Sequence, residues 1–455
     1  MDHWAGVVLA AGQGLRMNSK VSKVLHRVCG KELIRYPVEL LRDLGIPRIL
    51  VVVSPGNGEA VLRLLGDRVK YAVQPAALGS GDALQYAREA LQEPTEHLLV
   101  LNADVPLLLP GMLQQLMRRH VAGSYHMTLL TGRDMIAPDF GRVLRDSGGW
   151  LVDVVEAADM ANTKKLLSSP EEVNGGIYCF RAPWLWENLS SIEATLSGER
   201  ILTSLVAIGA RRGDHIGGVV AADTDNILGV NNRLQLAQVE AKLRQRIREQ
   251  WMMAGVTLLD PASVFIDADV TIGRDTVILP NTMLLGRTQI GEDCEVGPGS
   301  IVRDSSTGNR CRITTSVVEG STLGMDVRVG PFSHVRAGSC LERAVRLGNF
   351  VEITNSRLAA GAGMDHFGFV GDADVGAEAH LCAGMVTCNY DGKQKHQTVI
   401  GAGAFIGCDT MLVAPVTVGA EAVTGAGSVV TKDVPPGELA VGVPAKLKGP
   451  RPARN

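Results

Sequence analysis

A glycine-rich turn with two cations close by is the first segment whose residue types could do chemistry. The run Leu9-Ala10-Ala11-Gly12-Gln13-Gly14 is followed by Arg16 and Lys23. Small residues let backbone N–H groups approach phosphate oxygens, and fixed cations offset the charge of a phosphate in transfer. Met17 stands where a Rossmann fingerprint has its third glycine, and the Lys-Ser/Thr ending of a P-loop is missing. The spacing predicts a phosphate-handling loop of another kind, with a structural turn as the alternative.

Two further polar clusters carry oxygen atoms that a cation could use. Asn102-Ala103-Asp104 follows the apolar run Leu98–Leu101, and Asn231 and Asn232 open a long helical stretch. A single aspartate after a strand is usually a cap or turn residue, and asparagines are good helix caps. If Asp104 faces the glycine-rich loop, its carboxylate can instead hold the Mg²⁺ that nucleoside triphosphate chemistry needs. One asparagine would then be a second ligand.

These clusters must be positioned by the first half of the chain, where short apolar runs alternate with amphipathic stretches. The expected strands are Gly6–Ala10, Ile49–Val53 and Leu98–Leu101, and the expected helices are Lys31–Leu44, Ser80–Leu91 and Pro110–His120. This alternation predicts an α/β domain with a doubly wound, mostly parallel sheet. Ligands bind at the carboxyl ends of the strands in such sheets, which is where the clusters fall.

The second half has a different period, because an aliphatic residue recurs at every sixth position. The first run is Ile266, Ile272, Ile278, Leu284, Ile290, Val296 and Val302. After a short phase slip the spacing returns at Val317, Leu323, Val329, Val335, Leu341, Leu347 and Ile353, and again at Ile400, Ile406, Leu412 and Val418. Six fits a solenoid with three six-residue faces per coil, in which one aliphatic residue per face fills the axis.

One segment interrupts this repeat between Leu381 and Ile400. It contains Cys388-Asn389-Tyr390-Asp391-Gly392 and has no six-residue register, so it predicts a protruding loop of the kind that carries function on a rigid scaffold. A helix over 234–253 is the expected connector between the halves. The predicted domains are therefore 1–228, a helical linker at 229–253, and 254–455.

Composition excludes several classes of partner. The net charge of the 455 residues is −3, without a Lys/Arg run that would track nucleic acid or an anionic membrane. No apolar stretch approaches the length of about 20 residues that spans a bilayer, and the amino terminus does not read as a signal peptide. The eight cysteines form no Cys-x-x-Cys pair, so we expect reduced thiols and a cytoplasmic location.

The motifs taken together resemble one family. The glycine-rich loop, Lys23-Val24-Leu25-His26, Gly229-Val230-Asn231-Asn232-Arg233 and the Cys388–Gly392 segment look like those of the bifunctional N-acetylglucosamine-1-phosphate uridylyltransferases and glucosamine-1-phosphate N-acetyltransferases. The resemblance spans residues 7–434. It implies a Rossmann-like nucleotidyltransferase domain followed by a left-handed parallel β-helix, a homotrimer, and synthesis of UDP-N-acetylglucosamine.

For the first half, the resemblance implies uridylyl transfer from UTP to N-acetylglucosamine-1-phosphate, with release of pyrophosphate. Arg16 and Lys23 would attend the phosphates, and Asp104 and Asn231 would hold Mg²⁺. The implied nucleotide and sugar contacts are Leu9, Ala10, Ala11, Gly12, Gln74, Gly79, Ser80, Asn102, Gly141, Glu156, Asn174 and Asn231. Asp82 departs from the family, which usually has histidine at this position.

For the second half, the resemblance implies transfer of an acetyl group from acetyl-CoA to glucosamine-1-phosphate. His366 is the implied general base, since a neutral imidazole can take a proton from the attacking amine. The implied substrate and CoA contacts are Arg336, Asn389, Tyr390, Lys395, Ala383, Cys408 and Ala426. The departures from the family are Thr354 for a phosphate-binding lysine, Phe369 for tyrosine, His380 for asparagine, Cys408 for serine and Val443 for arginine.

These departures leave alternatives open. Loss of a cation that pairs with a sugar phosphate costs about 1.5 to 3 kcal/mol, so the acyl acceptor could differ. A second hypothesis keeps the nucleotidylyltransferase and makes the β-helix an altered or inactive acyltransferase. A third makes the chain a non-catalytic assembly protein that only senses nucleotide. Uridylyl- and thymidylyltransferases share the first loop, so the choice of UTP over dTTP depends on the whole-chain resemblance.

Overall fold

The chain folds into two compact units, residues 1–243 and 244–455, which are described separately. The computed structural model describes residues 3–91, 94–133, 140–157, 172–195 and 198–451. The expected connecting helix is α7, Arg233–Met253, and the boundary between the units falls inside it. In the described ranges, no helix has the length and apolar character needed to cross a membrane.

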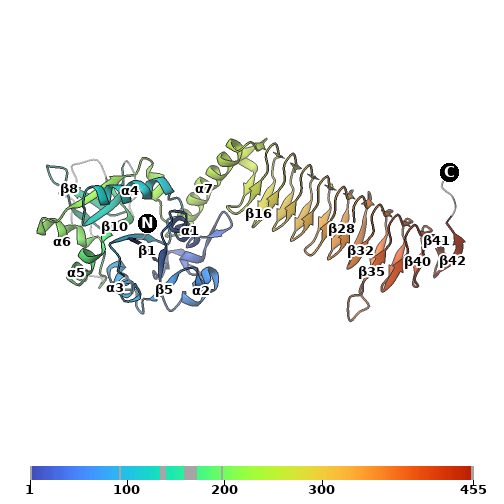
Figure 1. Ribbon diagram of the computed structural model, residues 1–455, viewed down its shortest axis with the longest axis horizontal. Helices are drawn as coiled ribbons and strands as arrows, with labels where there is room; N and C mark the ends of the chain where they lie inside the picture. Colours follow the sequence, from blue (N-terminus) through green and yellow to red (C-terminus); the bar gives the residue numbers. More distant parts are fainter. Residues whose placement is uncertain (1–2, 92–93, 134–139, 158–171, 196–197, 452–455) are drawn as a thin grey trace. The chain divides into compact units, whose positions relative to one another are not determined.

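The first unit is built on one mixed sheet (Figure 1). Its strands are β1 Trp4–Leu9, β4 Arg48–Val53, β5 Lys70–Val73, β6 His97–Asn102, β7 Met127–Gly132, β8 Arg142–Arg145, β9 Leu151–Val155, β10 Val173–Arg181 and β11 Ile216–Val220. The order is β11-β7-β10-β6-β1-β4-β5. Strand β1 lies between β4 and β6 and is parallel to both, whereas β10 runs antiparallel to β6 and β7. The prediction of a mostly parallel sheet is confirmed.

Helices cover both faces of this sheet. They are α1 Arg35–Asp43, α2 Gly58–Leu65, α3 Ser80–Ala90, α4 Pro110–Ala122, α5 Ala182–Asn188 and α6 Ser204–Arg212. Alternate residues of the buried strands face two separate hydrophobic cores, because successive side chains of a strand point to opposite faces. Helices α1, α2 and α4 contribute to one core and α3, α5 and α6 to the other.

The predicted helix over Lys31–Leu44 begins too early. Lys31–Glu32 is instead strand β3, which pairs antiparallel with β2, Arg27–Val28. The two turn residues, Cys29 and Gly30, both have positive φ, at 44° and 75°. A two-residue turn with positive φ at both positions suits a tight hairpin, so the chain turns here before α1 begins at Arg35.

Two histidines, the buried His120 and the half-buried His97, lie at the other end of this sheet from the glycine-rich loop. The rings of His97 and His120 are 5.2 Å apart between centroids, and both contact Trp4. His120 is fully buried, and its Nδ1 lies 2.9 Å from the Thr128 hydroxyl. Its Nε2 has no hydrogen-bond partner among the described residues. Burial, together with the charges of His97 and Arg181, lowers the pKa of His120 to about 3.

This lowered pKa predicts that acid destabilises the first unit. The unfolded chain takes up a proton on His120 below about pH 6.5, whereas the folded chain does so only near pH 3. The free energy of unfolding therefore falls as the pH decreases through this window. Between pH 7.5 and 5 the loss from His120 is on the order of 2 kcal/mol. We expect His120→Gln to remove that part of the pH dependence.

Tryptophan fluorescence can follow this effect in urea, because Trp4, Trp150, Trp184 and Trp186 lie in the first unit and only Trp251 lies in the second. His334→Gln, a substitution of a solvent-accessible histidine in the second unit, serves as the control and should leave the pH profile unchanged. A His120→Gln chain with the full wild-type pH dependence would contradict the prediction.

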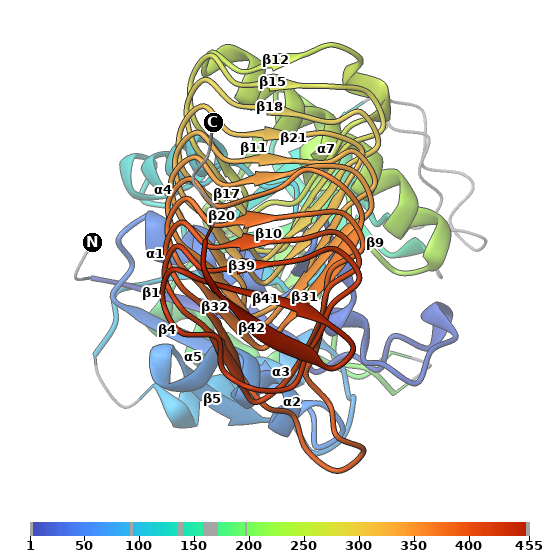
Figure 2. The same ribbon diagram turned by 90° about the vertical axis from the view of Figure 1, so that its right-hand side faces the viewer.

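The second unit is a parallel β-helix whose coils each contribute strands to three sheets (Figures 1 and 2). The β12 sheet contains β12 Thr257–Leu258, β15 Val277–Ile278, β18 Glu295–Val296, β21 Arg312–Ile313, β24 Arg328–Val329, β27 Arg346–Leu347, β30 Gly363–Met364, β33 His380–Leu381, β36 Phe405–Ile406, β39 Val423–Thr424, β41 Glu438–Gly442 and β42 Ala445–Pro450. The β13 sheet contains β13 Phe265–Ile266, β16 Met283–Leu285, β19 Ile301–Arg303, β22 Val317–Glu319, β25 His334–Val335, β28 Val351–Thr354, β31 Gly368–Gly371, β34 Val386–Cys388, β37 Met411–Val413 and β40 Val429–Val430. The β14 sheet contains β14 Thr271–Ile272, β17 Gln289–Ile290, β20 Ser306–Thr307, β23 Thr322–Leu323, β26 Cys340–Leu341, β29 Arg357–Leu358, β32 Ala373–Val375, β35 Thr398–Ile400 and β38 Val416–Val418.

The six-residue register is confirmed except at one position. The predicted inward residues are buried, but Val317 is only partly buried and Val318 fills the core instead. Ile266 pairs with Leu284 and Leu284 with Val302, eighteen residues apart each time, whereas Val302 pairs with Val318, sixteen residues further on. Two corners of this coil are each one residue shorter. The register therefore shifts without loss of an inward side chain on any face.

The predicted loop follows β34 and extends away from the stacked coils in both views (Figures 1 and 2). Tyr390 and Lys395 form an isolated antiparallel bridge across it. The Asp391 carboxylate accepts hydrogen bonds from the backbone of Lys393 and Gln394 and from His396. These bonds hold the pKa of Asp391 at about 2, so the charge that closes the loop persists across the neutral range.

Candidate functional sites

The glycine-rich loop and the Asn102 cluster leave neighbouring strands side by side. Leu9 at the end of β1 lies opposite Asn102 at the end of β6. Ala10 N–H donates to Val52 O at 2.8 Å, and Ala103 N–H donates to Leu9 O at 3.0 Å. Both clusters therefore start from backbone that the sheet fixes, at its carboxyl edge.

Two glycines in this region occupy positions that no other residue fits. Gly14 has φ +62°, and a Cβ there would lie 2.6 Å from Lys23 Cβ. Gly79 has φ +99°, and a Cβ there would lie 2.4 Å from the carbonyl oxygen of Arg200. Positive φ is costly for residues with a Cβ. These two glycines allow Lys23 and the backbone at Arg200 to pack directly against the loops.

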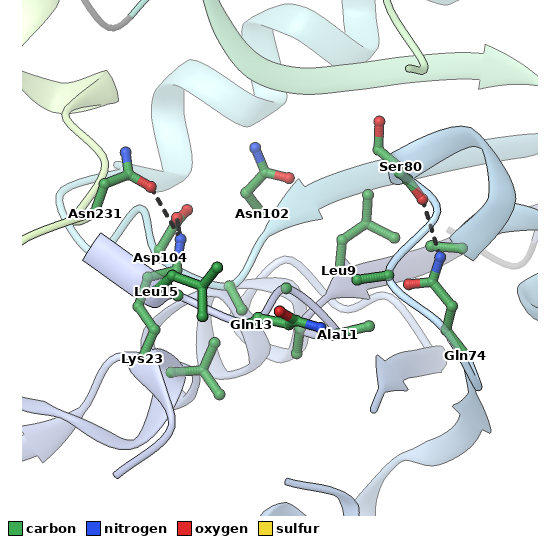
Figure 3. Close-up of a pocket in the computed structure, with 18 of the residues that line it drawn as sticks. Leu9, Ala11, Gln13, Leu15, Lys23, Gln74, Ser80, Asn102, Asp104 and Asn231 are labelled. Carbon is green, nitrogen blue, oxygen red and sulfur yellow. Dashed lines mark hydrogen bonds and ion pairs between the residues drawn. The ribbon is translucent and has the colours of Figure 1, made fainter. Parts of the chain in front are cut away.

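One pocket of about 690 Å³ collects every predicted nucleotide, phosphate and metal residue of the first unit (Figure 3). The predicted residues along its wall are Leu9, Ala10, Ala11, Gly12, Arg16, Lys23, Gln74, Gly79, Ser80, Asn102, Asp104 and Asn231. Its walls also include Gln13, Gly14, Val24 and Ala103 from the same sequence motifs. The motifs gave no sign of four further lining residues, Leu15, Ala77, Ala83 and Glu199.

The Lys23 ammonium is the centre of the polar end of this pocket. It donates to Asp104 Oδ2 and, at 3.1 Å, to Asn231 Oδ1 (Figure 3). Lys23 and Asp104 are each only 14% exposed, so their charges face one another with little screening by water. Two oxygen atoms from distant parts of the sequence thus converge on one cation.

The neighbouring asparagines divide the two roles that the sequence left open. Asn232 Oδ1 accepts from Gln235 N–H at 2.8 Å and caps α7, which begins at Arg233. The Gln235 side chain in turn accepts from Asn231 N–H at 2.8 Å. The helix cap therefore uses Asn232, and the side chain of Asn231 is left to face Lys23.

A second pocket of about 250 Å³ continues from the first and contains the three predicted sugar residues, Gly141, Glu156 and Asn174. The residues common to both pockets are Ser80, Asn102, Asp104 and Asn231. Asn174 Nδ2 donates to the Tyr178 hydroxyl at 2.8 Å. Burial raises the pKa of Tyr178, which therefore remains a neutral phenol. Two ligands bound in these pockets would meet beside Asp104.

Asp82, the departure from the family in this unit, has a defined role. Gln74 Nε2 donates to the buried Asp82 carboxylate at 2.8 Å and to Gly79 O at 3.1 Å. The aspartate therefore fixes the orientation of Gln74 and, through it, the turn at Gly79. A side chain at position 82 that accepts a hydrogen bond from Gln74 Nε2 is therefore compatible with this arrangement.

Sequence reasoning missed two residues that support the pockets. The buried Asn57 donates to Ala10 O at 2.8 Å and to Ser22 Oγ at 3.3 Å, joining the glycine-rich loop to the turn before Lys23. Thr203 Oγ1 donates to Glu156 Oε1 at 2.6 Å. Neither belongs to a local motif, so no signal in the sequence pointed to them.

In the β-helix, four predicted residues lie at corners between the β12 and β13 sheets on successive coils. His366 follows β30, Ala383 follows β33, Cys408 follows β36 and Ala426 follows β39. Three backbone hydrogen bonds join the four successive corners, from Gly384 N–H to Phe367 O, from Asp409 N–H to Ala383 O, and from Gly427 N–H to Cys408 O. The four residues form a continuous row along the β-helix that begins at the exposed imidazole of His366.

The same row contains a second thiol. Burial and the neighbouring Cys408 raise the pKa of Cys382 to about 11, so this thiol stays protonated at neutral pH. Among the departures, His380 stacks on Phe405 with ring centroids 5.2 Å apart, and Val443 is exposed in the turn between β41 and β42. Phe369 lies within β31, opposite Glu352.

Arg336, Thr354, Asn389 and Lys395 lie at the other end of the β13 sheet strands. Arg336 pairs with Glu352 at 2.7 Å, and Thr354 O accepts from Asp372 N–H at 3.1 Å. In the part of the chain that the structure describes, no hydrogen bond or ion pair joins His366 to these residues. Within one chain, the predicted acetyl-transfer residues therefore form two groups, one at each end of the same strands.

Comparison with known proteins matches both halves. Residues 6–166 match the MobA-like NTP transferase domain family, and residues 269–304 and 397–432 match the bacterial transferase hexapeptide (six repeats) family. These matches define a class, a nucleotidyltransferase domain joined to a hexapeptide-repeat transferase domain. The identity to curated relatives extends over nearly the whole chain, and the chain belongs to the bifunctional GlmU family.

Three relatives illustrate the match. The chain is 45% identical to the bifunctional protein GlmU of Heliobacterium modesticaldum over 97% of this chain and 96% of the relative. It is 43% identical to that of Caldanaerobacter subterraneus subsp. tengcongensis over 97% and 95%, and 42% identical to that of a Geobacillus species over 96% and 94%.

This membership makes the chain a bifunctional enzyme, a uridylyltransferase and an acetyltransferase. The interpretation of the β-helix as an inactive acyltransferase is not favoured, and the interpretation as a non-catalytic assembly protein is wrong.

Proposed function

We propose that the first unit transfers a uridylyl group from UTP to N-acetylglucosamine-1-phosphate, and that the β-helix acetylates glucosamine-1-phosphate from acetyl-CoA. The product would be UDP-N-acetylglucosamine, a cell-wall precursor. The observation that carries the first assignment is the convergence of Lys23, Asp104 and Asn231 at the junction of two connected pockets. One pocket has the glycine-rich loop and the other has the three residues expected to bind a sugar.

In the first reaction a phosphate oxygen of the sugar phosphate attacks the α-phosphorus of UTP, and pyrophosphate leaves. The backbone of Leu9 to Gly12 and the side chain of Gln74 would hold the nucleoside, and Glu156 and Asn174 would orient the sugar. Arg16 and Lys23 would stabilise charge on the phosphates. Such catalysis depends on positioning and electrostatics and needs no covalent intermediate.

Mg²⁺ is the metal that this chemistry implies, and the residues present fit it. Asp104 and Asn231 both direct an oxygen at the Lys23 ammonium, so the two oxygens already face a common cation. Carboxylate and amide oxygens are ligands that Mg²⁺ accepts. These two residues would hold the ion, and a bound Mg²⁺ supplies neutralisation of phosphate charge. Lys23 and Arg16 contribute their charge independently of the ion.

In the second reaction His366 would take a proton from the amine of glucosamine-1-phosphate as the nitrogen attacks the thioester carbonyl of acetyl-CoA. The C–S bond then breaks, and CoA leaves as its thiol. The exposed imidazole at the start of β31 is accessible to both substrates. Ala383, Cys408 and Ala426 would line the path of the CoA chain, with Asn389 and Tyr390 on the loop. Arg336 and Lys395 would face the sugar phosphate, because Thr354 brings no cation.

The division of the acetyl-transfer residues between the two ends of the strands supports a homotrimer as part of this proposal. A neighbouring copy could bring its Arg336 end to the His366 end of the first. We also propose that the enzyme works in the cytoplasm, where all four substrates are available, without nucleic-acid or membrane partners. The domain limits of 1–228, 229–253 and 254–455 remain proposals as well.

A matrix of substrates tests both activities at once. UTP, dTTP, ATP and GTP are each combined with N-acetylglucosamine-1-phosphate and with glucose-1-phosphate, with and without Mg²⁺, and pyrophosphate is measured. Glucosamine-1-phosphate and acetyl-CoA are assayed in parallel for thiol release. We expect pyrophosphate with UTP and N-acetylglucosamine-1-phosphate only when Mg²⁺ is present, and thiol release with glucosamine-1-phosphate. Preference for dTTP, or no thiol release, would contradict the corresponding half.

A further inference from the structure

Asp372, which no motif singled out, contacts three other polar side chains. It follows β31, and its side chain is only 13% exposed. Oδ1 accepts a hydrogen bond from Asn355 Nδ2 at 2.6 Å, and Oδ2 accepts one from Asn389 Nδ2 at 2.5 Å. The Lys395 ammonium lies 3.8 Å from the same Oδ2. One carboxylate thus contacts both sides of the loop at 389–397.

The loop has its own internal bonds, but its side-chain contacts to the coils converge on Asp372. Asp391 bonds within the loop to Lys393, Gln394 and His396. In the described chain, the side-chain hydrogen bonds and ion pairs from the loop to the coils are those of Asn389 and Lys395 to Asp372. The internal bonds shape the loop, whereas Asp372 fixes where it lies.

The neighbouring glycine makes room for this contact. A Cβ at Gly371 would lie 2.6 Å from Asn389 Nδ2, so a larger residue would displace the Asn389 side chain. Gly371 N–H and O both bond to the Thr387 hydroxyl on the next coil. The backbone under the loop is therefore fixed while leaving space for Asn389 to reach the carboxylate.

We propose that Asp372 is a positioning residue for acetyl transfer, which docks the loop on the coil so that Asn389 and Tyr390 are held for the acyl donor. This inference depends on the proposed acetyltransferase function of the β-helix. Tyr390 is 61% exposed and follows Asn389 directly, so its position is determined by the anchored residue before it. Hydrogen bonds to a charged acceptor are stronger than neutral ones, and a carboxylate can accept from both asparagines at once.

The test compares Asp372→Asn with the matched control Asp374→Asn. Asp374 lies two residues further on, and its carboxylate pairs at 2.8 Å with Arg357 on the preceding coil rather than with a loop residue. We expect Asp372→Asn to raise the KM for acetyl-CoA about tenfold, as loss of one charge-assisted bond predicts. Tryptic cleavage after Lys393 should accelerate by a similar factor. The control should change neither, and uridylyl transfer should stay constant in both.

A double-mutant cycle with Asn389→Ala separates positioning from a general structural role. If Asp372 acts through Asn389, the double variant should have about the same KM for acetyl-CoA as Asn389→Ala alone. Additive effects, or a wild-type KM in Asp372→Asn, would overturn the proposal. If Asp372→Asn does not fold, Asn389→Ala must still accelerate cleavage after Lys393, and unchanged cleavage would overturn it. A wild-type chain without acetyl transfer would instead refute the proposed function.

Discussion

An Asp104→Asn variant is expected to release pyrophosphate from UTP and N-acetylglucosamine-1-phosphate about a thousandfold more slowly than the wild-type chain. Loss of a preorganised charge at the reacting phosphates lowers the rate by about two to three orders of magnitude. The substitution keeps the shape of the side chain and removes its charge. The partly buried Lys23 ammonium would then face only neutral amide oxygens, without a carboxylate to balance its charge. The carboxylate oxygen expected to bind Mg²⁺ would also be lost.

The measurement is steady-state pyrophosphate release across a range of Mg²⁺ concentrations. Partial recovery of the rate at high Mg²⁺ would locate the defect in metal binding. Asp67→Asn, an exposed aspartate in the same unit, is the control for charge and should retain full activity. Acetyl transfer by the Asp104→Asn chain should be normal, because the β-helix is a separate compact unit. Wild-type uridylyl transfer in this variant would rule out Asp104 as a metal or phosphate residue.

A His366→Ala variant is expected to lose acetyl transfer by a factor of about 10² to 10⁴, the range that general-base catalysis contributes. The kcat should fall while the KM for acetyl-CoA changes little, because the imidazole acts on the amine proton rather than on the CoA chain. The exposed side chain makes no hydrogen bond within the described chain, so its removal should leave the unfolding midpoint unchanged.

Thiol release measured against pH sharpens this second prediction. The rate of His366→Ala should stay below the wild-type rate at every pH tested. His334→Gln is the control. His334 lies in the β13 sheet, with its imidazole 3.2 Å from Glu319, and this variant should behave as wild type. Full activity of His366→Ala would remove His366 from the mechanism.

The sequence was most informative where function depends on local spacing. The six-residue period was visible because every coil needs an aliphatic residue facing inward on each of its three faces. The two phosphate-site clusters were visible because the carboxyl ends of adjacent parallel strands meet at one edge of the sheet. The error at Val317 arose because a shortened corner keeps the hydrophobic pattern while shifting it by one residue. The error at Lys31 arose because a hairpin of two-residue strands has too few residues to show a period.

Contacts between distant segments were not predictable in this way. Asn231 and Asn232 are equivalent as caps, and only the position of Lys23, far away in sequence, distinguishes them. Asn57, Thr203 and Asp372 support functional residues through single bonds that depend on tertiary packing. Which side chain completes a site is therefore fixed by the assembled fold, even when the chemistry is already evident from the motif.

The shortened coil between Val302 and Val318 shows how the β-helix accommodates changes in length. Both losses are absorbed at corners, and the next strands return to the common inward register. The effect of an inserted or deleted residue is thus confined to the corner where it occurs, and the inward-facing positions of the following strands are kept. Evolution can lengthen a single corner into a recognition loop, or shorten another, and retune acyl-acceptor choice without redesigning the coils on either side.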